Sequence, residues 1–265
     1  MPAMIAHAVR KIRYLTGLFM SIENWYVAFP DYFGLLTGAE TTYTLRNGGR
    51  LKVAANVRAW ATICAIYWLK AFNPVGYEIR EGDVVVDIGA EFGIFSVFAA
   101  TNARNVKVYS YEPHPQNFES LTENVRINGL QANIYSFKLA VAGQHGIGKL
   151  YIDARDPSSH SLTRQLEDWV PVDFVTLQEV FESNKIERCD LLKLNCEGAE
   201  YQILRNTPRE YLQRIRKMAV QCHPIEFTPD ADPEGLKRFL EDMGFEATLA
   251  GAPSLYCYAR NTSTS

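Results

Sequence analysis

The sequence predicts an α/β fold in which a mostly parallel β-sheet is covered by helices on both faces. Short runs rich in β-branched residues alternate with amphipathic, helix-length segments from residue 84 onward. A tight glycine turn joins the first of these strands to the helix that follows it. The chain has 265 residues, of which 47% are apolar, and this is enough for one large α/β domain with an added segment.

Residues 1–75 are expected to form a helical and β-hairpin extension ahead of the main domain. Residues 3–36 are predicted to be helical, because apolar residues recur at steps of three and four from Ile5 to Phe19. Basic and aromatic side chains accompany this stripe. We favour a helical cap on the main domain or a contact in a homo-oligomer. A peripheral membrane helix, or a lid over a lipid-like substrate, is the alternative.

The extension continues with a hairpin and a second helix. Asn47-Gly48-Gly49 supplies the residues that a tight turn between residues 42–45 and 51–54 requires. Residues 60–72 then form a helix that ends before Pro74. The remainder, residues 76–260, is the main domain, and residues 261–265 form a flexible polar tail.

The main domain alternates strands and helices. The expected strands are residues 84–88, 106–111, 132–139, 190–195 and 217–222, with 245–249 and 255–259 as antiparallel strands at the C-terminal end. The expected helices follow residue 93 and span residues 114–127, 176–181, 198–205 and 232–243. Residues 148–153 are expected to form an antiparallel strand near the edge of the sheet, and 172–175 a short extended segment. Residues 154–169 are predicted to form a loop over the ligand side.

The turn after the first strand predicts a nucleotide-type site. Asp87 closes a buried run, and Gly89 and Gly93 follow at a four-residue spacing. Gly89 lets the chain turn sharply, and Gly93 lets a helix and a ligand approach closely. Backbone N–H groups and a helix N-terminus then face a ligand at the carboxyl end of the strand. A dinucleotide fingerprint is excluded, because Glu91 occupies the position of its second glycine.

Two further strand ends carry candidate nucleoside contacts. Glu112 ends the second strand, where a carboxylate accepts both ribose hydroxyls of a nucleoside, and Pro113 keeps it at the strand tip. A helix-capping role for this acid is the alternative. Ala140, in a run of small apolar residues after the third strand, is placed to sandwich an adenine ring or simply to pack in the core.

A second polar turn follows the strand at residues 190–195. Polar groups gather there, at the type of position where α/β enzymes hold substrate or catalytic groups. Glu197 is suited to bind a cofactor amino group, to accept the hydrogen of a substrate hydroxyl or to join a metal site. A helix N-terminal acid stabilised by the helix dipole is the alternative.

Three sequence blocks together resemble the FkbM-type S-adenosylmethionine (SAM) dependent methyltransferases. The blocks are Asp-Ile-Gly-Ala-x-x-Gly at residues 87–93, Tyr-Glu-Pro-His-Pro-x-Asn-Phe-Glu-x-Leu at 111–121 and Leu-Lys-Leu-Asn-Cys-Glu-Gly-Ala-Glu at 192–200. The resemblance covers roughly residues 40–250. It implies a seven-stranded, Rossmann-like class I methyltransferase fold, SAM as cofactor, and usually O-methylation of a small molecule, sugar or lipid-like metabolite.

The resemblance also assigns site residues. It implies that Asp87, Gly89 and Gly93 form the SAM turn and that Glu112 holds the ribose. With the expectations from the residues themselves, the predicted cofactor-binding set comprises Asp87, Gly89, Ala90, Glu91, Phe92, Gly93, Glu112, Pro113, Ala140 and Asn195. Glu197 would lie at the methionine and substrate end. The chain departs from the family pattern in three places: Glu91-Phe92 in the glycine turn, and the amides Asn195 and Gln221 where acids are usual. Because amides are poorer ligands for hard cations, no metal site is expected.

The predicted catalytic residues are His223, Glu197 and His160. Alignment of an acceptor oxygen with the methyl carbon is the main task in methyl transfer, and a base helps if that oxygen loses a proton. His223 follows the fifth strand, and its neutral imidazole suits a base near pH 7. His160, in the loop over the site, is the second candidate. His114 and His145 are interpreted as structural.

Composition limits the other classes. A net charge of −3 does not favour a nucleic-acid partner. The five cysteines are irregularly spaced and mostly lie in apolar runs, which indicates free thiols in a reducing, cytoplasmic compartment. No apolar segment is long enough to span a bilayer, and no signal peptide is predicted.

The sequence therefore predicts a cytoplasmic SAM-dependent methyltransferase that acts on a hydroxyl of a small-molecule or lipid-like acceptor. One alternative is a SAM-binding protein with weakened or lost methyl transfer, suggested by Asn195 and Gln221. An NAD-dependent dehydrogenase is disfavoured by Glu91. A membrane-surface enzyme that uses the basic N-terminal helix is the third alternative.

Overall fold

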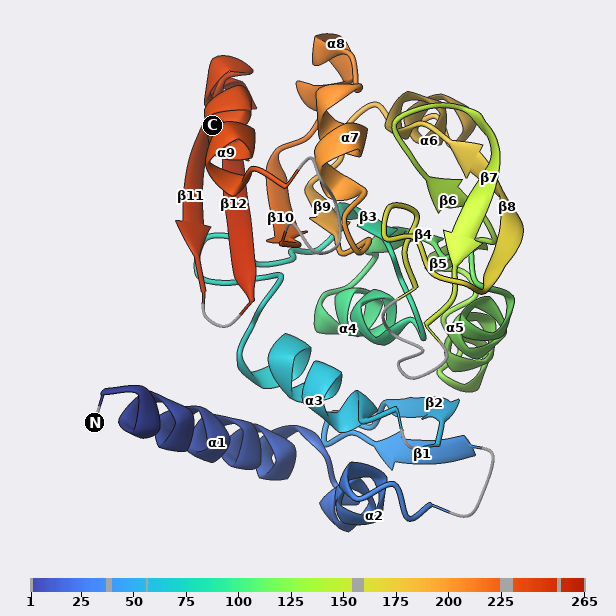
Figure 1. The fold of residues 1–265 in the computed structure, drawn as a ribbon, viewed down its shortest axis with the longest axis vertical. Coiled ribbons are helices and arrows are strands. Elements are labelled where there is room, and N and C mark those ends of the chain that lie inside the picture. The colour runs from blue at the N-terminus through green and yellow to red at the C-terminus, as the bar shows by residue number, and fades with distance from the viewer. Residues whose placement is uncertain are drawn as a thin grey trace.

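A computed structural model describes residues 2–36, 40–55, 57–153, 160–224, 231–251 and 254–264, with the backbone alone for residues 2–11. A seven-stranded sheet forms its centre (Figure 1). The strands, in order across the sheet, are β11 (Phe245–Ala250), β12 (Leu255–Asn261), β10 (Lys217–Cys222), β9 (Leu191–Leu194), β3 (Val84–Ile88), β4 (Lys107–Tyr111) and β5 (Ile134–Phe137). β12 runs antiparallel to β10 and β11, and the other pairs are parallel. The predicted class I methyltransferase sheet is confirmed.

The two faces of this sheet are covered by different sets of helices. Side chains alternate along each strand, so Val85 and Leu191 face one layer while Val86 and Leu192 face the other. The first layer contains α4 (Ile94–Asn102) and α5 (Pro115–Ile127). The second layer contains α6 (Leu177–Ser183), α7 (Glu200–Arg205), α8 (Arg209–Leu212) and α9 (Pro233–Asp242). The strands are hydrophobic on both faces because both faces are buried.

A separate three-stranded sheet lies beside the second layer. It consists of β6 (Ala140–Val141), β8 (Trp169–Val175) and β7 (Gly146–Tyr151), in that order. The expectation that residues 148–153 lie near the edge of the main sheet is therefore wrong, because their strand pairs with β8 instead. The extended segment predicted at 172–175 begins earlier, at Trp169. Residues 154–159 of the predicted loop lie outside the described residues.

The N-terminal extension is made of several short elements rather than one helical run. Its helices are α1 (Pro2–Ser21), η1 (Trp25–Val27), α2 (Ala28–Tyr32), α3 (Ala59–Ile63) and η2 (Cys64–Trp68), and its hairpin is β1 (Glu40–Thr44) with β2 (Arg50–Ala54). The prediction of helix over residues 3–36 is confirmed as far as Ser21 and again from Trp25 to Tyr32, and it is wrong for residues 22–24 and 33–36. Ile22 pairs instead with Leu45, and the Asn24 side chain binds the backbone of Thr42 and Thr44. These contacts to the hairpin replace the hydrogen bonds of a continuing helix.

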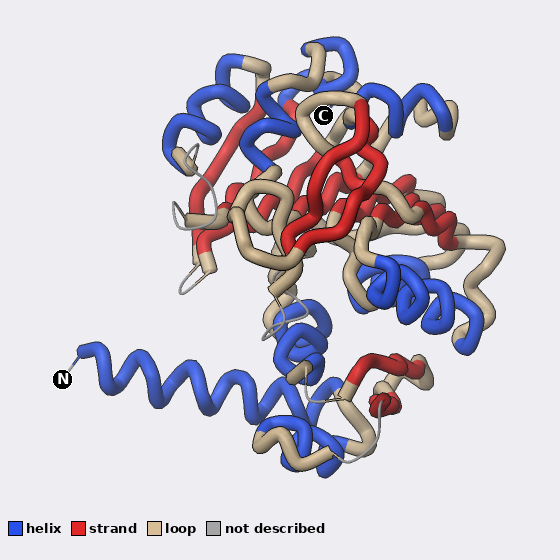
Figure 2. Tube along the Cα trace, turned by 45° about the vertical axis from the view of Figure 1, so that its right-hand side comes forward, coloured by secondary structure: helices blue, strands red, loops and turns tan. Residues whose placement is uncertain are grey.

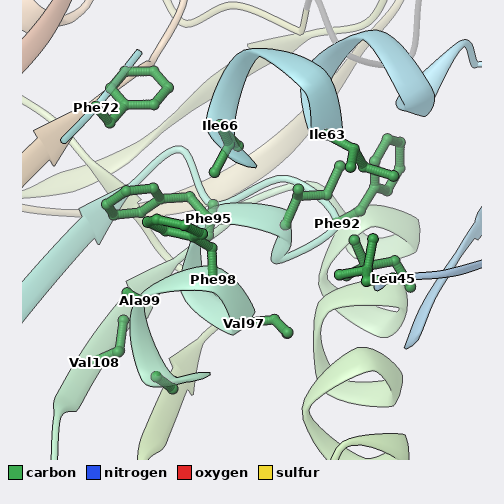
Figure 3. Close-up of a cluster of buried hydrophobic side chains, with 14 of the residues drawn as sticks. Leu45, Ile63, Ile66, Phe72, Phe92, Phe95, Val97, Phe98, Ala99 and Val108 are labelled. Atoms are coloured by element: carbon green, nitrogen blue, oxygen red, sulfur yellow. The ribbon is translucent and has the colours of Figure 1, made fainter. Parts of the chain in front are cut away.

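The extension shares its core with the first helical layer. Leu45, Ile63 and Ile66 from the extension lie against Phe92 and the α4 side chains in one buried cluster (Figure 3). Figure 1 and Figure 2 show the extension on the α4 and α5 side of the molecule, away from the second layer. The extension is thereby positioned over one end of the main sheet. The predicted boundary at residue 75, between the extension and the main domain, stays a prediction.

Asparagine side chains on α5 complete the hydrogen bonding of β2. The fully buried Asn124 accepts a hydrogen bond from the backbone N–H of Lys52 at 2.6 Å, and its Nδ2 donates to the carbonyl oxygens of Lys52 and Phe92 at 2.9 and 2.8 Å. One turn later, Asn128 makes the same pair of contacts to Arg50 at 2.8 and 2.6 Å. A strand edge with backbone groups of this kind needs partners when it is buried. The two amides supply them and anchor the hairpin to the main domain.

We expect Asn124→Ala to lower the free energy of unfolding by about 2 kcal/mol or more, because it leaves several buried backbone groups without partners. Urea denaturation followed by circular dichroism measures this loss. Asn102→Ala is the matched control, since Asn102 is exposed at the end of α4 and has helical backbone. An equal effect of both substitutions would contradict the anchoring role of Asn124.

Candidate functional site

The candidate site lies where three neighbouring parallel strands end at the same level. Ile88 of β3 pairs in register with Tyr111 of β4 and with Leu194 of β9. The next residue of each strand leaves the sheet, so Gly89, Glu112 and Asn195 lie at one edge of the sheet. Ligands of α/β proteins bind at this edge because the carboxyl ends of parallel strands and the helix N-termini converge there.

The glycine turn after β3 leaves no room for a side chain at Gly89. Its φ angle is +72°, and a Cβ there would lie 1.9 Å from the carbonyl oxygen of Asn195. Gly93, with φ of +77°, packs against Leu121 of α5 in the same manner. Glu91, between them, also has a positive φ of 54°, which a residue with a Cβ rarely adopts. The turn is therefore held in a conformation that the surrounding contacts impose.

Asp87 supports this turn from below. It is fully buried, lies 2.9 Å from Nζ of Lys193 on β9, and accepts a hydrogen bond from Ser96 Oγ at 2.6 Å. The Lys193 ammonium also donates to the carbonyl oxygen of Gly89 at 2.5 Å. Because a buried charge without a partner is costly, these contacts lock the turn to both strands. The structure thus places Asp87 beneath the predicted cofactor residues rather than at a cavity surface.

Glu112 points back toward the glycine turn. Its two carboxylate oxygens accept hydrogen bonds from the backbone N–H of Glu91 at 2.8 Å and of His114 at 2.9 Å. Burial raises the pKa of Glu112, the two backbone hydrogen bonds lower it in part, and the outcome is about 7. A carboxylate in this position is oriented by the backbone and is available to other hydrogen-bond donors near neutral pH.

A first cavity opens between these strand ends. The predicted cofactor residues that line it are Gly89, Glu91, Glu112, Pro113, Ala140 and Asn195. The other predicted members are not among its lining residues: Asp87, Ala90 and Phe92 are buried under the turn, and Gly93 packs on α5. Asn117, from the second sequence block, and Val141, beside Ala140 in the run of small apolar residues, also line the cavity. Leu150 of the small sheet and Leu162 of the segment after residue 160 complete the wall, and no local motif marks these two.

A second cavity, of about 570 Å³, adjoins the first. Glu91, Asn195 and Glu197 line both cavities and form the boundary between them. The polar end of the second cavity also holds Gln221 and His223. Its other walls are largely apolar and come from the N-terminal extension and the C-terminal strands: Tyr14, Ala61, Ala65, Ile66, Phe72, Leu255 and Tyr256.

A buried imidazole joins two carboxylates at this boundary. His223 Nε2 lies 3.1 Å from Glu197 Oε1, and its Nδ1 lies 2.9 Å from Oε1 of the fully buried Glu200. Burial lowers the pKa of His223, but hydrogen bonds to Glu197 and Glu200 outweigh this effect and raise it to about 10. His223 is therefore an imidazolium near pH 7. This charge state does not suit the neutral base expected from the sequence.

The backbone of Glu197 is held in an uncommon conformation. Its φ angle is +52°, and its carbonyl oxygen accepts hydrogen bonds from Ser161 Oγ at 2.6 Å and Thr163 Oγ1 at 3.2 Å. The side chain is 14% exposed, facing the two cavities. The segment after residue 160 therefore positions Glu197 through its main chain. The sequence gives no local signal for this contact, because it joins residues about 35 positions apart.

The remaining predicted histidines lie apart from this cluster. His160 lines the first cavity, where its ring is 4.1 Å from that of His114 and its Nδ1 accepts a hydrogen bond from the Asp153 backbone. Burial lowers the pKa of His114. The exposed His145 pairs with Glu179. The structure thus brings His223 and Glu197 together and places His160 on the side of Glu112 and Pro113.

Asn195 and Gln221, the two amides at positions where acids were expected, both reach the second cavity. Asn195 Oδ1 is buried and has no hydrogen-bond partner among the described residues. Gln221 Nε2 lies 3.4 Å from His223 Nε2. In the described part of the chain, no group of three His, Cys, Asp or Glu side chains has the geometry of a metal site. The arrangement offers hydrogen-bond acceptors and donors to a ligand at the cavity boundary.

The fold and this site define a class I methyltransferase, and comparison with known proteins identifies the family. The sequence profile of the Methyltransferase FkbM domain matches residues 87–247. The chain therefore belongs to the FkbM methyltransferase family, which implies the use of SAM. A solved structure titled as methyltransferase FkbM from Methylobacillus flagellatus KT has the same fold: the TM-score is 0.50 at 12% identity, over 96% of this chain and 60% of that one.

Curated relatives resemble the chain at low identity. "Methyltransferase sdnD" of Sordaria araneosa is 24% identical, over 62% of this chain and 74% of its own length. "31-O-demethyl-FK506 methyltransferase FkbM" of Streptomyces tacrolimicus is 25% identical, over 57% of this chain and 69% of its own length. "Hexuronic acid methyltransferase AglP" of Haloferax volcanii is 24% identical, over 62% of this chain and 64% of its own length. The substrates named for the second and the third differ, so the acceptor of this chain does not follow from them.

The residues at the strand ends fit SAM. The cofactor carries ribose hydroxyls, which need acceptors such as the backbone-oriented Glu112 carboxylate. It also carries an amino group, which the unpartnered Oδ1 of Asn195 is placed to accept from. The first cavity provides apolar walls from Ala140, Val141 and Leu150 for an adenine ring. No side chain at position 89 obstructs the space between β3 and β9.

We expect the His223 imidazolium to make folding depend on pH. Its pKa is raised from about 6.5 in the unfolded chain to about 10 in the folded protein, so its contribution is complete below pH 6.5 and is lost as pH rises toward 10. The free energy of unfolding, measured with urea at pH 7 and pH 10, should fall more in the wild type than in His223→Gln. An equal fall in the free energy of unfolding in both proteins would show that His223 is neutral. If His223→Gln does not fold, ¹⁵N NMR of the wild-type imidazole decides the same question.

Proposed function

We propose that this protein transfers the methyl group of SAM to a hydroxyl oxygen of an uncharged small molecule with an apolar body. The observation that carries the proposal is the pair of adjoining cavities that meet at Glu91, Asn195 and Glu197. A cofactor in the first cavity and an acceptor in the second would face each other across these residues. Family membership supports methyl transfer, and the chemistry of the second cavity supports the acceptor class.

The first cavity is the proposed cofactor site. Glu112 would bind the ribose hydroxyls, Ala140 and Val141 would flank the adenine ring, and Gly89 and Asn195 would contact the amino-acid end. When bound there, SAM supplies an electrophilic methyl group on a sulfonium sulfur. The protein contributes by holding donor and acceptor in line, since alignment of the reacting atoms supplies much of the rate in such displacements.

The second cavity supports an acceptor that is apolar at one end and has a hydroxyl at the other. Tyr14, Ile66, Phe72, Leu255 and Tyr256 offer an apolar and aromatic wall. The opposite end holds two carboxylates, Glu197 and Glu91, with the single imidazolium of His223. An acceptor carboxylate or phosphate would meet like charge there. A neutral hydroxyl, in contrast, would donate a hydrogen bond to Glu197.

Glu197 is the proposed proton acceptor, and His223 and Glu200 are positioning residues. With SAM bound, Glu197 would accept the proton of the acceptor hydroxyl as its oxygen took the methyl group and S-adenosylhomocysteine left. His223 holds the Glu197 carboxylate at 3.1 Å, and Glu200 holds His223 through both its ring and its backbone N–H, at 2.9 and 2.7 Å. Held this way, Glu197 keeps one orientation without reorganising during the reaction.

Substitution of Glu112 should weaken cofactor binding. Glu112→Gln removes the charge-assisted hydrogen bonds to the ribose, so the affinity for S-adenosylhomocysteine should fall by about ten- to a hundredfold. In the wild type the affinity should also decrease below pH 7, by up to about tenfold per pH unit, because the pKa of Glu112 is about 7. Isothermal titration calorimetry from pH 5.5 to 8 measures both effects.

The matched control for this experiment is Glu119→Gln, an exposed acid on α5, the helix that follows Glu112. It should bind S-adenosylhomocysteine like the wild type and show the same pH dependence. If the folded wild type does not bind, the cofactor assignment fails. If Glu112→Gln binds as tightly as the wild type, the ribose role of Glu112 fails while the cofactor assignment stands.

Substitution of Glu197 should reduce turnover more than cofactor binding. We expect Glu197→Gln to lower kcat by about a hundredfold or more, while the affinity for S-adenosylhomocysteine stays within a fewfold of the wild type. Labelled SAM and a panel of neutral amphipathic alcohols, each paired with the carboxylic acid of the same skeleton, provide the assay. Mass spectrometry of the product then locates the methyl group.

The matched control is Glu187→Gln, an exposed acid ahead of β9. Methylation of the acids in preference to the alcohols, or methylation at nitrogen or carbon, would contradict the proposed acceptor. Cofactor binding without transfer to any compound would favour the SAM-binding protein that Asn195 and Gln221 suggested.

A further inference from the structure

The N-terminal extension carries a contiguous apolar surface that faces solvent. On α1, Ile12, Leu15 and Phe19 follow one another at steps of three and four residues and are exposed, opposite the face that packs on η2. The surface continues over η1, α2 and the residues after it. Its members, which we call the apolar surface, are Ile12, Leu15, Phe19, Met20, Tyr26, Phe29, Tyr32, Phe33 and Leu35.

The degree of exposure separates this surface from ordinary scattered apolar residues. Ile12 is 62% exposed, Tyr26 64% and Phe33 65%. Tyr32 and Phe33 contact each other at 5.0 Å between ring centroids. Phe19, Tyr26 and Phe29 each contact the half-buried ring of Trp25, at 4.8, 6.2 and 5.8 Å, so the aromatic side chains are clustered. Large exposed apolar patches on proteins usually mark a binding surface. The extension lies at one end of the molecule, with α1 directed away from the central sheet (Figure 1, Figure 2).

Arginines accompany the apolar surface. Arg13 is exposed on α1, Arg46 donates to the backbone of Phe19 at 2.5 Å, and the Arg58 guanidinium lies 5.5 Å from the ring of Tyr32. The sequence of α1 contains Arg10, Lys11 and Arg13 and no acidic residue. Asp31, within the same segment, is buried and binds the hydroxyl of Tyr43. The charge that this region presents is therefore mainly positive.

We propose that the apolar surface docks on an anionic lipid bilayer. Aromatic and aliphatic side chains bordered by arginines match the boundary between acyl chains and negatively charged headgroups. Among the described residues no helix is long and apolar enough to cross a membrane, so α1 would lie in the plane of the bilayer. This inference goes beyond the proposed function, because lipid binding requires neither SAM nor methyl transfer.

Charge favours a bilayer over a second copy of the chain. A two-fold contact through this surface would bring the same patch of both copies together, with residue i of one copy against residue j of the other. Both copies would bring arginines to the contact, with Glu23 as the exposed acid in residues 12–36. An anionic bilayer instead offers a complementary charge to each of them. Tyr14, on the same helix, lines the second cavity, so the docked surface would lie beside the proposed acceptor site.

Vesicle co-sedimentation of the full chain tests the proposal. The wild type should bind phosphatidylcholine–phosphatidylserine vesicles more strongly than phosphatidylcholine vesicles, and added salt should weaken the binding. The triple variant Ile12→Ser/Met20→Ser/Phe33→Ser should lose binding by at least about tenfold. Arg13→Gln should lose about fivefold, the effect of one surface charge near such a bilayer. Circular dichroism checks that each variant is folded.

The matched control is the double variant Val75→Ser/Ile147→Ser, which changes two residues that are 95% and 77% exposed outside the apolar surface. It should bind like the wild type. Failure of the wild type to bind vesicles overturns the proposal. If light scattering shows that the wild type is a dimer and the triple variant a monomer, the surface belongs to a contact with a second copy. Equal losses in the control and the triple variant also overturn the proposal. If the triple variant does not fold, the proposal is overturned when Arg13→Gln binds vesicles as tightly as the wild type, or when high salt leaves the binding of the wild type unchanged.

Discussion

The close approach of β3 and β9 just beyond their ends is the constraint on which the candidate site depends. Gly89 lies so near the carbonyl oxygen of Asn195 that any side chain at position 89 would displace one of the two loops. This contact brings the glycine turn, the Glu112 carboxylate and the turn before α7 to one edge of the sheet. Asp87 and Lys193 reinforce it from below with a buried ion pair, and Lys193 also donates to the carbonyl oxygen of Gly89. The shape of both cavities follows, because their shared boundary is built from these loops.

Buried charge is concentrated in the same region, and each charge has a specific partner. Asp87 is paired with Lys193, while Glu197 and Glu200 share the imidazolium of His223. Removing one member of such a group is more costly than its net contribution suggests, because the partner would be left charged in a poorly solvated place. These contacts fix the orientation of Glu197. Its carboxylate is held by His223, and its backbone carbonyl oxygen is held by Ser161 and Thr163. A carboxylate fixed from both directions suits the recognition of a single acceptor hydroxyl.

The N-terminal extension joins the site to the surface of the molecule. Asn124 and Asn128 fasten its hairpin to α5, and its buried side chains belong to the same cluster as those of α4. Residues from α1, α3 and η2 can therefore form a stable wall of the second cavity. The opposite side of α1 carries the apolar surface proposed to meet a bilayer. One helix thus links an apolar environment outside the protein with the apolar side of the acceptor cavity, which fits an amphipathic substrate.

The sequence by itself determined the class of fold and the strand ends that carry the site. Strand periodicity, the turn from Gly89 to Gly93 and the acids Glu112 and Glu197 are local features, set by backbone sterics and by the alternation of buried side chains. The tertiary structure decided the rest. It placed Asp87 below the turn, assigned residues 146–151 to a separate sheet, ended α1 at Ser21 and made His223 an imidazolium through Glu197 and Glu200. Each of these depends on partners distant in the sequence, and a pKa or a strand pairing is set by the groups that folding brings into contact.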